Sequence, residues 1–199
     1  MNTCAFYKSI VIFIVLLFIW KVNVSFCQNE GGESKIPNSV ISDYLNELKQ
    51  DSIAQSISYL QSFKTRFSLT QNRKQIAEWI AQKFNSYGYD AKLDSFKVIA
   101  DAPYYEIWLY NVVADYPGVI WPDDILILGA HYDSKTQSND TASAPGADNN
   151  ASGVAAMLEI ARVFKLKMLN PNRTIRFIAF TMSENPIIHP NTICGSCEY

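Results

Sequence analysis

Two residues that could bind a metal, His131 and Asp133, directly follow the apolar run Ile125–Ala130. In extended backbone, residues two apart leave the chain on the same face, so the carboxylate can accept the imidazole N–H and fix the tautomer of a metal-ligating histidine. The apolar run has the length and bulk of a strand buried on both faces, as in a parallel sheet. The pair is a metal site only if further donors come to it.

The elements that follow would bring such donors. Helical spacing runs from Ala151 to near Leu169, before Pro171, and Thr174–Thr181 has the β-branched and aromatic composition of a second strand. A strand, a helix and a strand in this order predict a right-handed parallel crossover, in which both strands end at the same edge of the sheet. Ligands bind at that edge in open α/β sheets. The residues expected there are His131, Asp133, Asp148 and Glu184.

These donors are an imidazole nitrogen and carboxylate oxygens, with no thiolate in the stretch. Such a set favours zinc or another first-row divalent ion in a hydrolytic site over a structural zinc site. The alternative is an α/β core whose loops happen to carry acidic residues.

Three segments of this region together resemble a known family. They are HYDS at His131–Ser134, APGADNNASGVAAMLE at Ala144–Glu159 and RTIRFIAF at Arg173–Phe180. Their order and spacing are similar to those of the zinc aminopeptidases of the bacterial leucyl aminopeptidase type, metallopeptidase family 28. The resemblance implies a zinc-dependent exopeptidase that removes N-terminal residues from peptides, with two zinc ions as cofactors.

The resemblance also implies a role for each site residue. His131 would bind one metal ion, Asp148 would bridge the two ions, and Asp133 would orient His131. The family's Glu-Glu pair, a general base followed by a ligand, falls on Ser183 and Glu184. The ligand is therefore expected and the base is absent, because a serine hydroxyl does not accept a proton near neutral pH.

The fold implied by the resemblance is a three-layer α/β/α sandwich with a mixed, mainly parallel central sheet. The family's remaining Asp and His ligands have no counterpart, so the fold is expected to be incomplete at the C-terminus and the activity of this chain is in doubt. One alternative function is a non-catalytic binding or scaffold protein, or an inactive fragment, with the same fold. A second is an enzyme similar to glutaminyl cyclases, which share the fold.

Composition limits the other partners. The 199 residues are 48% hydrophobic and 18% charged, with a formal net charge of −2, so neither nucleic acid nor an anionic membrane is an expected partner. Residues 1–27 have the character of a signal peptide, residues 28–38 of a flexible spacer, and residues 39–199 of a partial peptidase-like domain. Export to the periplasm or the extracellular space is expected, with an uncleaved N-terminal membrane anchor as the alternative.

The remaining helical and strand patterns complete the expected fold. The strands expected at Ala91–Ile99 and Tyr105–Asp115 should pair antiparallel at the edge of the sheet. Asp51 should be the N-cap of the helix expected at Asp51–Phe63. Arg66 is expected to be an ion-paired surface arginine. The helices are expected at Val40–Lys49, Asp51–Phe63 and Thr70–Tyr87, and the strands at Ala91–Ile99 and Tyr105–Asp115.

Overall fold

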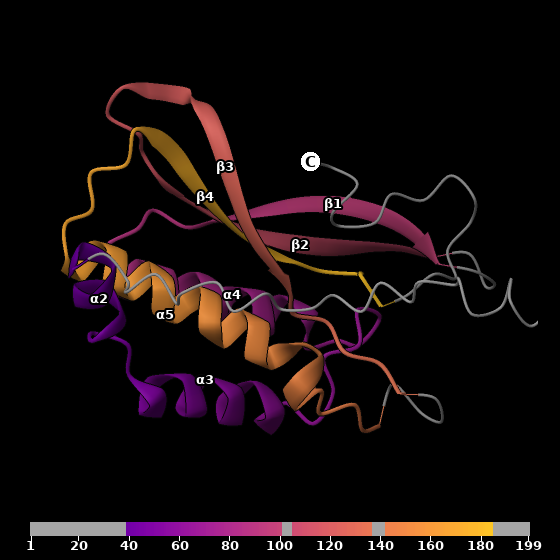
Figure 1. Ribbon diagram of the computed structural model, residues 1–199. Helices are drawn as coiled ribbons and strands as arrows, with labels where there is room; N and C mark the ends of the chain where they lie inside the picture. The colour runs from indigo at the N-terminus through magenta and orange to yellow at the C-terminus, as the bar shows by residue number, and fades with distance from the viewer. Residues whose placement is uncertain (1–38, 101–104, 137–141, 185–199) are drawn as a thin grey trace, which may run out of the picture. The chain divides into compact units, whose positions relative to one another are not determined.

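Four strands form one mixed sheet in the computed structural model, which describes residues 39–100, 105–136 and 142–184 (Figure 1). The order across the sheet is β1-β2-β4-β3. The strands are β1 (Lys92–Ala100), β2 (Tyr105–Tyr116), β3 (Trp121–His131) and β4 (Arg173–Phe180). The segments assigned to a signal peptide and a spacer lie outside the described residues.

The pairing confirms the predicted α/β fold with a mixed sheet. β3 and β4 are parallel, from Ile125 opposite Thr174 to His131 opposite Phe180, and β1 and β2 form the expected antiparallel pair at one edge. β2 and β4 are also antiparallel. One of the three described pairs is therefore parallel, so the expectation of a mainly parallel sheet does not hold for these strands.

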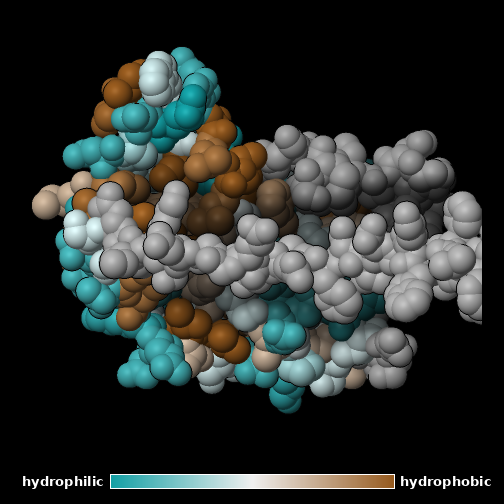
Figure 2. Space-filling view, viewed as in Figure 1, coloured by the Kyte–Doolittle hydropathy of each residue, from teal (hydrophilic) through white to brown (hydrophobic). Residues whose placement is uncertain are grey.

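β3 does not have the environment that its sequence predicts. Within the described residues it pairs with β4 on one side only, and Ile125, Leu126 and Ile127 are 44%, 63% and 45% exposed. Figure 2 shows hydrophobic residues gathered on this part of the surface. The prediction of a strand buried on both faces is wrong here, because apolar composition reports what a strand can bury and not which neighbours it has.

The helices cover one face of the sheet (Figure 1). α4 and α5 pack on the strands, and α3 packs on α5. Within the described residues there is no second helical layer of the predicted sandwich, and none of their helices has the length and apolarity to cross a membrane. The helical segments are α2 (Ser39–Leu45), α3 (Gln50–Ser62), α4 (Arg73–Ser86), the short irregular η1 (Ala147–Ala151) and α5 (Ser152–Leu166).

The helix boundaries differ from the predicted ones by a few residues at most ends. Lys49, and not Asp51, occupies the N-cap position of α3, and no side chain caps the helix there. Asp51 lies in the first turn, where its charge still favours the helix dipole. Gly88 follows the C-cap residue Tyr87 of α4, and its φ of +88° is one that glycine adopts without strain.

Two apolar clusters lie on opposite faces of β2, because side chains alternate along a strand. The main cluster joins the inner faces of α4 and α5 to the sheet through residues such as Ile80, Phe84, Leu158 and Phe177, all fully buried. The smaller cluster contains Val98, Ile107, Leu109 and Met182. Met182 lies two residues after the end of β4, so the smaller cluster holds the chain directly before Ser183 and Glu184.

A buried ion pair ties α5 to the segment before α3. Glu159 is 1% exposed and accepts hydrogen bonds from the Arg162 side chain and from the Lys49 amide, at 2.6 to 2.9 Å. Arg162 also donates to the Glu47 carbonyl. Burial alone raises the pKa of Glu159, but the hydrogen bonds from Arg162 and Lys49 outweigh it and hold the pKa below its ordinary value.

Glu159→Gln should therefore lower the free energy of unfolding at neutral pH by about 3 kcal/mol, because it leaves Arg162 partly buried without its charge partner. A carboxyl whose pKa is lower in the folded state stabilises above its unfolded pKa and loses that contribution as the pH falls. Urea unfolding at pH 7 and pH 4 should show a smaller loss of stability on acidification for Glu159→Gln than for wild type.

Glu78→Gln is the matched control, since Glu78 pairs with Lys74 on the exposed side of α4. It should change the free energy of unfolding by less than about 1 kcal/mol. Equal effects of the two substitutions would contradict the role given to Glu159.

Candidate metal centre

Three side chains from three segments meet beyond the carboxyl ends of β3 and β4. His131 Nε2 lies 3.0 Å from Asn149 Oδ1 and 3.6 Å from Glu184 Oε1. The Asn149 side-chain nitrogen donates to the same Glu184 oxygen at 2.8 Å. His131 ends β3, Asn149 lies in η1, and Glu184 follows β4. The parallel crossover brings His131 and Glu184 together as predicted, whereas Asn149 was not among the expected residues.

The other nitrogen of His131 faces Asp133. His131 Nδ1 lies 3.1 Å from the Asp133 carbonyl oxygen and 3.4 Å from Asp133 Oδ1. The hydrogen bond to Asp133 is the main reason why the pKa of His131 is raised, and burial opposes it. In the protonated ring Nδ1–H donates to Asp133 and Nε2–H to Asn149. Asp133 therefore has the geometry of the orienting residue that the sequence predicted.

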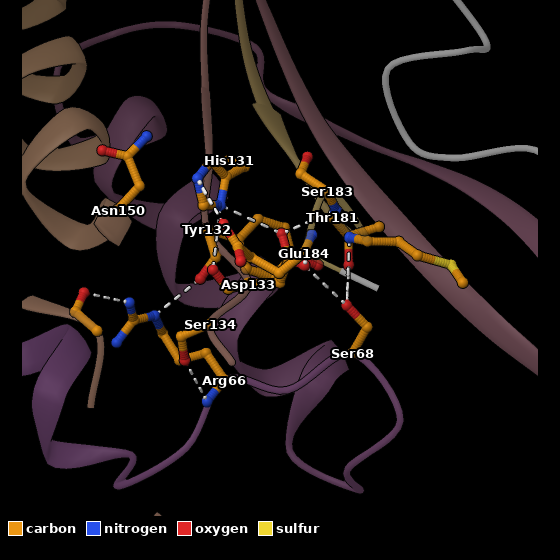
Figure 3. A network of polar contacts seen from close by, with 12 residues as sticks. Arg66, Ser68, His131, Tyr132, Asp133, Ser134, Asn150, Thr181, Ser183 and Glu184 are labelled. Atoms are coloured by element: carbon orange, nitrogen blue, oxygen red, sulfur yellow. Dashed lines mark hydrogen bonds and ion pairs between the residues drawn. The ribbon is translucent and has the colours of Figure 1, made fainter. Parts of the chain in front are cut away.

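Asp133 also holds the segment that carries Ser183 and Glu184 (Figure 3). Its carboxylate is 1% exposed and accepts the Ser183 amide at Oδ1, at 3.1 Å, and the Glu184 amide at Oδ2, at 2.9 Å. The Ser68 hydroxyl donates to Oδ2 as well, at 3.4 Å. A buried carboxylate needs such donors because each replaces lost hydration.

The turn after β4 is held residue by residue. The amides of residues 181 to 184 each donate to a side-chain oxygen: the first to Asn111 Oδ1, the second to Ser68 Oγ, and the last two to Asp133. Asn111, Ser68 and Asp133 are all buried. Met182 has a φ of +61°, uncommon for a residue other than glycine. Buried side chains thus hold this turn in a conformation that its own sequence does not favour.

Asp148 is not brought to the same point. It is exposed, its carbonyl accepts a hydrogen bond from Ser152, and no hydrogen bond or ion pair joins its carboxylate to His131 or Glu184. Asn149 lies there instead, because its φ and ψ of −115° and 91° are extended and turn adjacent side chains in different directions. The resemblance implied the ligand role for Asp148, and nothing in the sequence indicated that Asn149 would lie nearer to His131. The role of Asp148 as a ligand stays a prediction.

Ser183, where the resemblance implies a general base, is exposed on the rim of the site. The Ser183 amide donates to Asp133 Oδ1 at 3.1 Å, and this hydrogen bond fixes the Ser183 backbone. The short side chain of Ser183 is thereby directed away from the core (Figure 3). The position is accessible to a substrate, but the hydroxyl there cannot do the work of a carboxylate near neutral pH.

Arg66 differs most from its expected role. It is 1% exposed and donates to backbone carbonyls, so the expectation of an ion-paired surface arginine is wrong. A single arginine shortly after a helix carries no sequence signal for burial, because arginine is almost always at the surface.

The separations between His131, Asn149 and Glu184 would allow the three side chains to share one divalent ion. Two ligands of a zinc ion, each about 2.1 Å from it, can be up to about 4.2 Å apart, so the separations of 3.0 and 3.6 Å suit shared coordination. The third donor is an amide oxygen, and the described residues contain no group of three or more His, Cys, Asp or Glu side chains that could hold a metal. Donors for a second ion are not found among them.

Comparison with known proteins points to one family. The profile of "Peptidase family M28" matches residues 111–199. A probable aminopeptidase of Saccharomyces cerevisiae is 27% identical over 75% of this chain and 41% of its own length. A probable zinc metalloprotease of Pyrenophora teres f. teres is 30% identical over 78% of this chain and 37% of its own length. The chain thus spans about two fifths of the length of these relatives.

Solved structures show the same fold. A leucine aminopeptidase precursor from Bacteroides thetaiotaomicron matches 75% of this chain and 52% of its own, with a TM-score of 0.59 and 20% identity. A glutaminyl cyclase from Tannerella forsythia matches 74% of this chain and 54% of its own, with a TM-score of 0.57 and 23% identity. At such identities the two structures support the fold alone.

Asp133→Asn tests the central role of the buried carboxylate. The amide has one acceptor oxygen in place of two, so at least one of the Ser183 and Glu184 amides loses its partner. The free energy of unfolding should fall by about 3 kcal/mol, since hydrogen bonds to a buried charge are lost. Urea unfolding followed by circular dichroism measures this change.

Asp115→Asn is the matched control, because Asp115 pairs with Arg176 at a half-exposed position on the sheet. Its effect should stay below about 1 kcal/mol. If Asp133→Asn were as mild, the turn after β4 would be held by something other than this carboxylate.

Proposed function

This chain resembles peptidase family M28 in sequence and in fold, and from that premise we propose that it carries a variant zinc aminopeptidase site. Such a site would bind the N-terminus of a peptide and hydrolyse its first peptide bond slowly. The convergence of His131, Asn149 and Glu184 beyond the parallel strands is the observation that carries the proposal. The similarity to a probable aminopeptidase and to a probable zinc metalloprotease supports a metallopeptidase, and zinc as its metal.

Each residue has a part that its contacts support. His131 Nε2, Asn149 Oδ1 and Glu184 Oε1 would hold the ion, and Asp133 keeps the proton on Nδ1 so that Nε2 can act as a ligand. Zinc, when bound, lowers the pKa of a bound water and polarises a carbonyl. Glu184 keeps its place because Asp133 fixes its amide.

The proposal of slow turnover rests on two positions. Ser183 stands where the resemblance implies a general base, and loss of a general base costs about 100-fold to 10,000-fold in rate. Asn149 contributes a neutral amide oxygen between His131 and Glu184, where a carboxylate would add a negative charge and bind a cation more strongly.

The same two positions favour the second candidate, a non-catalytic protein that binds peptide N-termini. Such a protein needs the rim of the site and the ion but no general base. Zinc content after reconstitution and dialysis, together with turnover of an aminoacyl reporter, separates the two candidates. A bound ion with no turnover, even after a base has been supplied, supports the binder.

A glutaminyl cyclase activity is the third candidate, and it is supported only by the fold. A peptide with an N-terminal glutamine distinguishes it, since cyclisation removes ammonia and leaves the peptide bonds intact.

Ser183→Glu should raise the rate of zinc-dependent hydrolysis of leucyl-aminomethylcoumarin by about 100-fold or more, because it supplies the missing base. Asn149→Asp should strengthen zinc binding, measured by competition with a chromogenic chelator, by adding a charged donor. The double variant should combine the two effects, and a chelator should abolish the gain.

Ser86→Glu, which adds the same carboxylate at the exposed end of α4, is the control and should leave the rate unchanged. Fast turnover by the wild-type chain would show that Ser183 does not occupy the position of the base. A Ser183→Glu variant that binds zinc without any gain in rate would exclude the slow aminopeptidase.

A further inference from the structure

The Arg66 guanidinium is surrounded by backbone carbonyls. Nε donates to the Tyr132 carbonyl at 2.7 Å, Nη1 to the carbonyls of Leu60 and Pro145, and Nη2 to the Gly146 carbonyl at 2.8 Å. Four hydrogen bonds from a group with five N–H donors leave little of it unsatisfied. One buried side chain therefore binds the end of α3, the end of β3 and the turn before η1.

Two of these acceptors belong to the turn that leads to Asn149. Gly146 has a φ of +48°, and its carbonyl also accepts the Ala151 amide at 3.1 Å. A Cβ atom at Gly146 would lie 2.9 Å from Arg66 Nη2 and 2.6 Å from the Asn149 carbonyl oxygen. The turn is therefore packed directly on the guanidinium, and Asn149 is packed on the turn.

The other contacts reach the strand that carries His131. Tyr132, whose carbonyl accepts from Nε, lies between His131 and Asp133 in the chain. The backbone of Arg66 also joins this segment, since its amide donates to Ser134 Oγ at 3.1 Å and its carbonyl accepts the Ser134 amide at 3.3 Å. Ser134 Oγ in turn donates to the Ala144 carbonyl, and Figure 3 shows Arg66 and Ser134 side by side below His131.

Charge explains why this site takes an arginine. Burial lowers the pKa of Arg66 to about 10, and the negative charge of Asp133 opposes that shift, so the side chain stays charged near neutral pH. Only the planar guanidinium presents donors in several fixed directions, whereas a lysine ammonium offers three donors at a single point.

We propose that Arg66 is a positioning residue that sets the distance between His131 and Asn149, and through it the affinity of the site for a divalent cation. The guanidinium is the one described side chain that donates both to the β3 end and to the turn before Asn149. The part of the inference that concerns the cation rests on the proposed function. The part that concerns the distance does not.

The metal-free test uses the ring of His131, which is one of only two histidines in the chain. Nitrogen-15 spectra of the imidazole rings report tautomer and hydrogen bonding, and His131→Gln identifies the signals. In Arg66→Lys the ring signals of His131 should shift, because Asn149 moves away from Nε2. The Ala151 amide should also exchange with solvent at least about 10-fold faster, since local opening of the turn becomes easier.

The metal readout is zinc affinity, which should fall about 10-fold to 100-fold in Arg66→Lys, the loss typical of a residue that supports ligands without binding the metal. Gly146→Ala displaces the same turn while Arg66 remains, so it should change ring signals and affinity in the same direction. Gly146→Ala therefore tests the inference even if Arg66→Lys does not fold.

Arg73→Lys is the matched control. Arg73 also donates to two backbone carbonyls, those of Thr70 and Trp108, but neither belongs to the site. It should leave the ring signals unchanged and zinc affinity within about twofold. Unchanged His131 signals in both test variants, or equal shifts in the control, would overturn the inference. If wild-type protein bound no zinc, the proposed function and the cation part would fail, and the ring signals would still decide whether Arg66 sets the distance.

Discussion

The buried carboxylate of Asp133 is the constraint that shapes the rim of this sheet. A charge removed from water must be met by donors, and here the Ser183 and Glu184 amides, the Ser68 hydroxyl and the His131 ring meet it. Because these donors come from the loop after α3 and from the turns after both parallel strands, satisfying one group fixes the relative positions of three segments. The strained φ of Met182 is tolerated for the same reason.

The framework of the site and its reactive positions are thus separate layers. Asp133, Ser68, Asn111 and Arg66 are buried and bind backbone, whereas Ser183 and Asn149 are exposed on the rim. A substitution in the buried layer disturbs the fold, while a change on the rim alters chemistry and leaves the geometry in place. A fold can therefore keep the shape of a peptidase site when the residues that perform hydrolysis differ.

Sequence reasoning succeeded where a pattern has a direct physical cause. The parallel pair β3 and β4, the helix between them and the meeting of His131, Asp133 and Glu184 followed from hydrophobic periodicity and the crossover rule. It failed where the outcome depends on contacts distant in sequence. The burial of Arg66 depends on carbonyls up to 80 residues away, and the exposure of Ile125 to Ile127 depends on which strands flank β3. The choice between Asp148 and Asn149 depends on backbone dihedrals that no periodicity encodes.

The exposed flank of β3 has a geometric consequence for access to the centre. Within the described residues this strand has a neighbour on one side only, and it runs from Trp121 to His131, so its final residue carries the imidazole. Strand addition along an open edge places every residue of the newcomer opposite a defined residue of the host. A polypeptide that paired along β3 would therefore have one of its residues opposite His131, at the candidate metal centre.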